Sequence, residues 1–271
     1  MTRLTQQFEM ASATDVGRVR AHNEDSISTD PEIGLATLAD GMGGYNAGEV
    51  ASGIAVALVP AEIRKLSAND GLRALSDEAI REMVAAQASK VNTAIYAAAQ
   101  KQQQYSGMGT TLVVAYWHGD RVTIGHLGDS RCYRLRGQEM KPLTRDHSWI
   151  QEQIDAGLMS VEQARASKKK NLVTRACGID PHAVPEVHTH DVQANDIYVL
   201  CSDGLYDMVA DEDIQLTVSS LKSNLPLAAQ QLVQQANDNG GRDNISIILV
   251  RVVKVASPPA GFFARIKNWF K

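Results

Sequence analysis

Two short connections between apolar segments constrain the fold of this chain more than any other feature. His118-Gly119-Asp120 separates the segments Thr111–Trp117 and Arg121–Leu127. Gly128-Asp129-Ser130 separates the second of these segments from Arg131–Arg136. Glycine-containing links of three residues are typical of β-hairpins, whereas parallel strands need a crossover of about a dozen residues or more. Both links therefore predict hairpins and, with them, antiparallel sheet.

Further segments predict how strands and helices follow one another. Runs rich in β-branched and apolar residues predict three more strands, at Ile33–Ala39, Asp196–Cys201 and Ile245–Val255. Periodic patterns predict helices at Ala47–Leu66, Ser76–Gln104, His147–Ala156, Val161–Ala166, Asp211–Leu221 and Leu227–Asn237. Strands and helices are grouped rather than strictly alternating. The grouping favours an α+β arrangement of layers over a doubly wound fold.

The composition limits the class of the protein. A chain of 271 residues, 44% of them apolar, is long enough for one large domain or two small ones with a well-buried core. Its net charge of −4 provides no basic field that would attract nucleic acid, so we expect no nucleic-acid partner. The opening MTRLTQQFEM is polar, and no run approaches the roughly 20 apolar residues of a membrane-spanning helix. We therefore expect a cytoplasmic protein.

The three cysteines are expected to be buried, reduced and chemically inert. Cys132, Cys177 and Cys201 are odd in number, lie in or beside apolar runs and lack metal-ligand spacing. A cysteine-dependent phosphatase would need an arginine six positions after the nucleophile. The residues at those positions are Gln138, Ala183 and Asp207. This pattern excludes that chemistry.

Four aspartates lie where predicted strands end or begin, each close to a glycine. Asp40, Asp129 and Asp203 follow apolar strands, and Asp243 precedes the last strand. In an antiparallel sheet the end of one strand lies beside the start of its neighbour, so all four can share one edge. A single Asp-Gly pair is most simply a turn. Four such sites that adjoin apolar strands favour a functional cluster.

A cluster of carboxylates predicts a metal site. Like charges repel one another unless a cation joins them. Hard oxygen ligands favour Mg²⁺ or Mn²⁺ over zinc. Two such ions about 4 Å apart can hold a phosphoryl group and lower the pKa of a water between them. The aspartates therefore indicate metal-dependent phosphoryl chemistry.

Eight short motifs, taken in order, resemble a known family. They are VRAHNEDS, DGMGG, GTT, GDSR, LTRDHS, LVTRACG, SDGL and GGRDNIS. The set is similar to the bacterial branch of the metal-dependent protein phosphatases, the PPM or type 2C serine/threonine phosphatases, from about Ser12 to about Val253. The resemblance implies a four-layer α-β-β-α sandwich, in which helices flank two antiparallel sheets.

The resemblance also implies a role for each site residue. Asp40 would bridge two metal ions, Gly41 would give one of them its backbone carbonyl, and Asp203 and Asp243 would complete the shell of the other. Asp129 would join Asp203 at a weaker third ion. Glu24 and Asp25 would hold waters in the metal shells. Arg20 would bind the substrate phosphate, and Asn244 would orient a water or a phosphate oxygen. Arg131 is expected to have a structural or supporting role.

The implied reaction is a direct in-line attack of metal-activated water on phosphorus, without a phospho-enzyme. Relatives place a histidine near the first metal motif as a proton donor. The corresponding positions here are Met42 and Tyr45. His126 and His147 are expected to be structural, so the general acid stays unassigned, and a metal-bound water is one candidate for it.

The domain organisation follows from the same resemblance. Residues 1–254 are expected to form the phosphatase domain, with a flap at about 146–175 that contains Lys168-Lys169-Lys170. Those lysines either attract an acidic phosphopeptide or are a solvated helix end. Residues 255–271 are expected to be a linker and an amphipathic tail. Residues 261–271 of this tail either dock on a membrane surface or a protein, or fold back on the domain.

The resemblance implies phosphoproteins as substrates, a bacterial Ser/Thr kinase as the opposing enzyme, and a monomer. Three alternatives fit the sequence less well. A regulatory phosphatase of the same fold would usually carry a sensor domain, for which the chain has no room. A catalytically silent binding module conflicts with the intact aspartates and Arg20. A nucleotide-binding loop at Asp40–Gly48 fails because Asn46 breaks the required glycine spacing.

Overall fold

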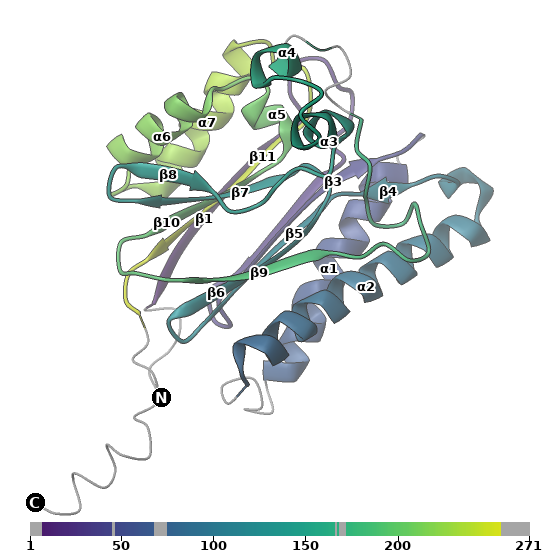
Figure 1. The fold of residues 1–271 in the computed structure, drawn as a ribbon, viewed down its shortest axis with the longest axis horizontal. Coiled ribbons are helices and arrows are strands. Elements are labelled where there is room, and N and C mark those ends of the chain that lie inside the picture. Colours follow the sequence, from purple (N-terminus) through teal and green to yellow (C-terminus); the bar gives the residue numbers. More distant parts are fainter. Residues whose placement is uncertain (1–6, 45–46, 68–74, 166, 168–171, 256–271) are drawn as a thin grey trace, which may run out of the picture.

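The computed structural model describes residues 7–44, 47–67, 75–165, 167 and 172–255. Its centre is a pair of antiparallel sheets (Figure 1). The five-stranded sheet has the order β1 (Phe8–Asp15), β11 (Ile245–Val252), β10 (Ile197–Cys201), β7 (Arg131–Arg136) and β8 (Glu139–Pro142). The six-stranded sheet has the order β2 (Asp25–Asp30), β3 (Leu35–Met42), β5 (Leu112–His118), β6 (Arg121–Leu127) and β9 (Glu186–Asp191), with β4 (Gly109–Thr110) paired to β3.

The central strands are buried on both faces because each sheet lies between two cores. In β10, Tyr198 and Leu200 face the other sheet, where they pack in one cluster with Trp117 and Ile248. The alternate residues of β10 pack in the cluster on the helical side. This period-two alternation explains why β10 reads as a continuous apolar run.

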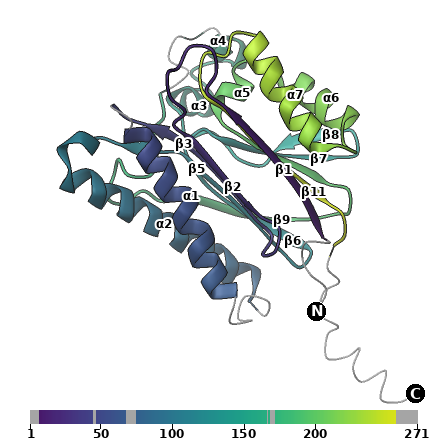
Figure 2. The same cartoon turned by 180° about the vertical axis from the view of Figure 1, so that it is seen from behind.

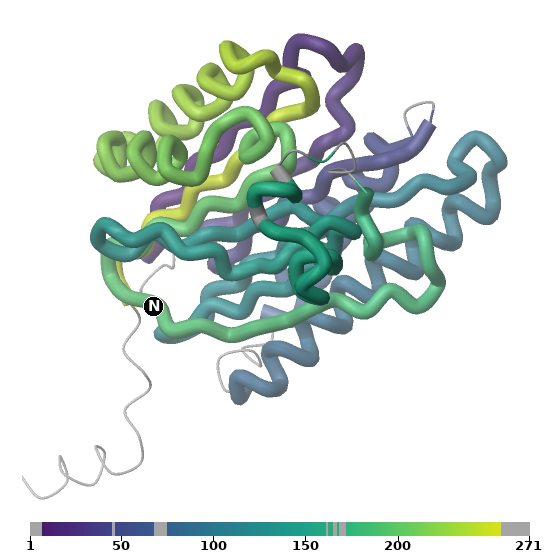
Figure 3. Tube along the Cα trace, turned by 45° about the horizontal axis from the view of Figure 1, so that its top comes forward, coloured from purple at the N-terminus to yellow at the C-terminus, as the bar shows by residue number. Residues whose placement is uncertain are grey.

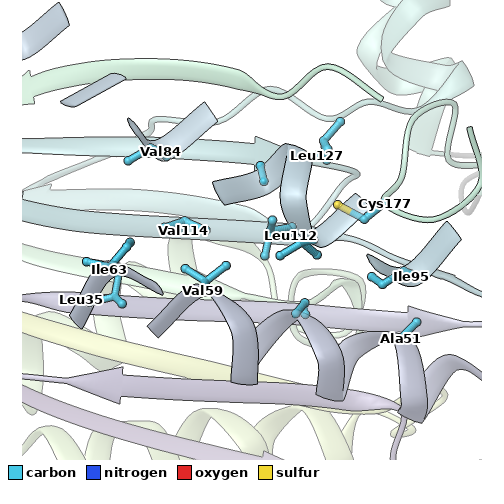
Figure 4. Close-up of a cluster of buried hydrophobic side chains, with 14 of the residues drawn as sticks. Leu35, Ala51, Val59, Ile63, Val84, Ile95, Leu112, Val114, Leu127 and Cys177 are labelled. Atoms are coloured by element: carbon cyan, nitrogen blue, oxygen red, sulfur yellow. The ribbon is translucent and has the colours of Figure 1, made fainter. Parts of the chain in front are cut away.

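Helices α1 (Ala47–Ser67) and α2 (Asp77–Lys101) cover the outer face of the six-stranded sheet (Figure 2). Ala47, Ala51, Ala55, Val59 and Ile63 recur every fourth residue of α1 and are fully buried. Figure 4 shows several of these side chains directed towards the strands, with α2 residues beside them. The predicted start of α2 is confirmed, since the Ser76 side chain accepts a hydrogen bond from Ala79 N. Short η3 (Gln103–Tyr105) follows α2.

Helices α5 (Asp203–Tyr206), α6 (Asp211–Ser220) and α7 (Leu225–Asp238) cover the outer face of the five-stranded sheet. Together with α1 and α2 they complete the predicted four layers. Helix α7 begins two residues before the predicted Leu227, because the Asn224 side chain caps it and a proline follows in the first turn. Helix α5 was not predicted.

One of the two predicted hairpins is wrong. His118-Gly119-Asp120 does join the paired strands β5 and β6. Gly128-Asp129-Ser130, however, leads from β6 in the six-stranded sheet to β7 in the five-stranded sheet, so it connects the two sheets. Gly128 takes a φ of +101°, and a Cβ there would lie 2.6 Å from the side chain of Thr111. The glycine is needed for this close crossing.

Residues 146–175, predicted as the flap, contain α3 (Trp149–Asp155) and α4 (Val161–Arg165). Both helices agree with the prediction to within two residues. Backbone hydrogen bonds from Trp149 N to Leu172 O and from Thr174 N to His147 O close the segment at its base. Figure 3 shows these helices in front of the sheets, between the two helical layers. Lys168-Lys169-Lys170 and the predicted tail lie outside the described residues.

None of the helices in the described parts of the chain is both long enough and apolar enough to cross a membrane.

Candidate active site

The four predicted aspartates meet at one end of the sandwich, and both sheets contribute to them. Asp40 lies in β3, and Asp129 lies in the connection after β6. Asp203 begins α5 directly after β10, and Asp243 precedes β11. Electrostatic repulsion couples Asp40 to each of the other three. The sequence predicts that the four aspartates share one edge of a single sheet. The cluster instead lies across the two sheets.

Asp40 is fixed by its backbone. Its N–H donates to the Thr111 hydroxyl at 2.9 Å, and its carbonyl accepts from Thr110 Oγ1 and Thr111 N, both at 2.8 Å. The Thr111 hydroxyl also bonds that of Ser130 at 2.7 Å, which ties β3 to the connection containing Asp129. The carboxylate of Asp40 thus projects from a rigid support.

Asp25 and Glu24 lie next to Asp40 on β2 and the loop before it. Asp25 is opposite Asp40 in the β2–β3 register and accepts a 2.8 Å hydrogen bond from Ser202 Oγ. The Glu24 carbonyl accepts from Gly41 N at 3.1 Å and from the Ser52 hydroxyl at 2.6 Å. These contacts bring Glu24, Asp25 and Gly41 to the same place as the four aspartates.

Burial and mutual repulsion raise the pKa of several carboxyl groups in this cluster. Burial, followed by the charges of neighbouring aspartates, raises the pKa of Asp40 and that of Asp203 well above the ordinary range. Burial raises the pKa of Asp25 to about 7 and that of Asp129 to about 6. Buried oxygen donors that repel one another are the donor set that Mg²⁺ or Mn²⁺ requires, so these residues fit such ions.

Arg20 is a cation that faces this cluster. Its Nη2 donates to Asp243 Oδ2 at 2.7 Å, and its charge also interacts with Asp203 and Glu24. The Arg20 side chain is 51% exposed, so part of the guanidinium remains open to solvent. It lies where it can bind an anion brought to the carboxylates.

Asn244 differs from its prediction. It is 6% exposed, and both hydrogens of its amide donate at 2.9 Å, one to the carbonyl of Val16 and one to that of His22. Its Oδ1 accepts from Glu24 N at 2.8 Å. The amide donors predicted to orient a water or a phosphate oxygen are thus engaged by the backbone of the N-terminal loop.

Arg131 has the supporting role expected of it. It makes a two-pronged contact with Asp146 at the start of the flap, with Nη2 2.7 Å from Oδ2 and Nε 3.0 Å from Oδ1. Its guanidinium also stacks 3.6 Å above the ring of Tyr206. The Tyr206 hydroxyl donates to the carbonyl of Asp129 at 3.1 Å. Arg131 therefore connects the flap, α5 and the backbone of Asp129.

His126 and His147 form a stacked pair with ring centroids 4.7 Å apart. With Glu186 they have the spacing of a metal site. His147 Nδ1, however, accepts from Gly128 N at 3.2 Å, which leaves the ring proton on Nε2, facing Glu186 Oε2 at 3.4 Å. His126 Nε2 lies 2.8 Å from the carbonyl of Arg145. These bonds support the predicted structural role of both rings.

A cavity of about 690 Å³ opens beside the carboxylates. Asp129 and Asp203 line one part of it, and Ile150 and Ile154 of the flap line another. The flap therefore lies beside the carboxylates, where the flap can contact a substrate.

The side chains that support the site were not predicted from the sequence. Thr111, Ser202 and Tyr206 lie within or beside the GTT and SDGL motifs, but only their contacts with Asp40, Asp25 and Asp129 reveal their role. Their position in those motifs was the available signal.

Comparison with known proteins decides the family. The model of the family described as protein phosphatase 2C matches residues 6–245, most of the chain. The chain belongs to the protein phosphatase 2C family. It is a serine/threonine protein phosphatase, and it shares the family's dependence on a metal. It is 36% identical over 240 residues to the serine/threonine phosphatase Stp of Listeria innocua, an alignment that covers 88% of this chain and 93% of that relative.

Solved protein phosphatase 2C structures share the fold. The serine/threonine phosphatase PstP of Mycobacterium tuberculosis superposes with a TM-score of 0.82 at 33% identity, covering 92% of this chain and 100% of that one. The catalytic domain of PstP in complex with two manganese ions gives a TM-score of 0.79 at 33% identity, covering 92% and 99%.

Proposed function

We propose that Asp40, Gly41, Asp203 and Asp243 of this phosphatase hold two Mn²⁺ or Mg²⁺ ions, and that Asp129 joins Asp203 at a weaker third ion. Asp40 would bridge the first two ions, Gly41 would offer its carbonyl to one, and Asp203 and Asp243 would bind the other. The convergence of mutually repelling, half-buried carboxylates from both sheets supports this assignment. The structure of PstP in complex with two manganese ions supports the proposed pair of ions.

The protein residues have distinct tasks in the reaction. When bound, the ions would polarise the phosphoryl oxygens and lower the pKa of a water. Arg20 would bind the phosphate through the guanidinium donors that Asp243 leaves open, and so place phosphorus in line with the attack. Glu24 and Asp25 would accept hydrogen bonds from waters beside the ions. In this way the chain neutralises and orients the phosphate monoester of a serine or threonine.

Hydrolysis of a phosphothreonine peptide tests the metal assignment. We expect activity with Mn²⁺, loss of activity in EDTA, and a fall on the order of 100-fold or more for Asp203→Asn. Asp213→Asn is the matched control, since Asp213 is an exposed aspartate in the first turn of α6. Activity of Asp203→Asn in EDTA equal to that of the unaltered enzyme in Mn²⁺ would refute the metal mechanism.

We also propose that the substrates come from a Ser/Thr kinase, because phosphate monoesters on serine and threonine arise by phosphoryl transfer. The relatives named as serine/threonine phosphatases support this substrate class. A cytoplasmic monomer stays a prediction, which sedimentation analysis and fractionation of cells can test.

The tail of residues 261–271, outside the described residues, is proposed as a docking segment because its aromatic residues share one helical face in the sequence. Sedimentation with lipid vesicles of the full chain and of a chain ending at Ser257 tests membrane binding. Equal sedimentation would exclude it.

A further inference from the structure

The loop of residues 16–24 carries Arg20 and is exposed over much of its length. Val19 in this loop is 69% exposed, and the side chain of Arg20 itself is half exposed. An exposed loop samples many conformations unless buried groups hold its ends. The position of the Arg20 guanidinium therefore depends on how the loop is anchored.

We infer that Asn244 is a positioning residue, which holds this loop closed and thereby sets the orientation of Arg20 towards the phosphate. One buried amide binds the carbonyl of Val16, the carbonyl of His22 and the N–H of Glu24. Val16 and His22 lie on either side of Arg20 in the sequence. The same side chain thus closes the loop around Arg20 and fixes its exit towards β2.

The neighbouring contacts give the loop a defined direction. Arg18 N donates to the Gly241 carbonyl at 2.7 Å, and Arg20 itself pairs with Asp243. Both partners belong to the segment that also contains Asn244, so the loop and this segment form one unit. If the bonds to Asn244 are lost, the contacts at Gly241 and Asp243 remain, but the two carbonyls that bracket Arg20 are released.

Loss of this anchor should weaken phosphate binding more than it weakens the fold. A guanidinium that is oriented before the anion arrives loses less conformational freedom on binding. The inference rests on the proposed role of Arg20 in gripping phosphate. It predicts that substitutions at Asn244 act through Arg20, so that their effect disappears when Arg20 is absent.

The test is competitive inhibition by inorganic phosphate, measured with p-nitrophenyl phosphate at saturating Mn²⁺. We expect Arg20→Ala to raise the inhibition constant about tenfold, and Asn244→Ala to raise it by several fold. In the double variant we expect no increase beyond that of Arg20→Ala. Asn244→Asp, which keeps the shape but loses the amide donors, should behave like Asn244→Ala and serves if the alanine variant does not fold.

Asn92→Ala is the matched control. Asn92 is also a buried asparagine that bonds a loop, with Oδ1 accepting from Gly178 N at 2.6 Å and Nδ2 donating to the Asp180 carbonyl at 2.9 Å. Its loss should lower the melting temperature without changing phosphate inhibition. Mn²⁺ affinity, measured by calorimetry for every variant, separates an effect on the metals from one on Arg20.

Any one of three outcomes would overturn the inference. If Arg20→Ala raises the inhibition constant but neither Asn244 variant does, the positioning role is wrong while the proposed function stands. Effects that multiply in the double variant would show that Asn244 does not act through Arg20. An inhibition constant unchanged by Arg20→Ala would refute the phosphate role proposed for Arg20, and the positioning role with it.

Discussion

At the scale of single residues, burial determines the pH at which Asp129 takes up its charge. Asp129 is only 5% exposed, and burial raises the pKa of its carboxyl to about 6. Its ordinary pKa, 3.8, applies in the unfolded chain. The folded state therefore binds the proton more tightly. The stability that this proton contributes is complete below pH 3.8 and is lost as the pH rises through about 6.

Asp129→Asn should accordingly stabilise the metal-free protein at pH 8. The amide cannot ionise, so it avoids a cost of about 2–3 kcal/mol, from about two pKa units at 1.36 kcal/mol each. We expect the melting temperature in EDTA to rise by about 5 °C at pH 8 and by about half as much at pH 5, which lies between the two pKa values. Differential scanning fluorimetry measures both. A lower melting temperature at pH 8 would contradict the assigned burial penalty.

At the scale of elements, the connection between the sheets places Asp129 and depends on Gly128. We predict that Gly128→Ala destabilises the protein by about 1–3 kcal/mol and lowers activity, because the new methyl group meets Thr111 and displaces the backbone that carries Asp129.

Gly119→Ala is the control for that prediction. Gly119 also has a positive φ, +58°, but a Cβ there meets no atom within 4 Å. Its substitution should cost about 1 kcal/mol and leave activity unchanged. Urea unfolding and a phosphopeptide assay distinguish the two. Equal losses of stability and activity in both variants would show that the close contact with Thr111 is unimportant.

Strands with a run of apolar residues could be predicted, and strands of largely polar sequence could not. The bounds of β6 and β7 agree with the prediction because turn residues interrupt apolar runs there. Strands β1, β2 and β9 were missed since their sequences, FEMASATD, DSISTD and EVHTHD, are polar at many positions and half-buried. The hairpin predicted at Gly128-Asp129-Ser130 is wrong for a different reason. A short glycine-containing turn has the same sequence pattern whether the strands it joins share a sheet or lie in two sheets.

The convergence of the aspartates could be predicted from the sequence, but the hydrogen bonds around them could not. The aspartates could be found because each adjoins a strand and a glycine. The task of Asn244 could not, since its partners lie 220 to 228 residues away in the sequence. Such contacts exist only after the sheets have assembled, and no local pattern specifies them.

At the scale of the whole molecule, the carboxylates couple metal binding to stability. Asp40 and Asp203 have strongly raised pKa values and Asp25 one of about 7, so in each case the folded state holds the proton more tightly. Stability from these protons is lost as the pH rises through the folded-state values. A bound cation replaces the protons and removes the repulsion.

We therefore expect the metal-free protein to melt at a lower temperature at pH 8.5 than at pH 7. Mn²⁺ should raise the melting temperature at both values, and by more at pH 8.5, because fewer protons compete with it. Scanning calorimetry in EDTA and in Mn²⁺ measures this. A stabilisation by Mn²⁺ that is equal at both values would show that the ion does not displace these protons.

The pairing of β1 with β11 also determines how the enzyme would be oriented on an anchoring surface. Asp15 lies opposite Ile245, two residues from Asp243, whereas Phe8 lies opposite Val252 at the other end of the two strands. The seven residue steps from Phe8 to Asp15 span about 23 Å. The chain thus enters its first strand and leaves its last one at the pole remote from the carboxylates. A tether at that pole would leave the catalytic end facing the surrounding solution, where phosphoproteins can approach it.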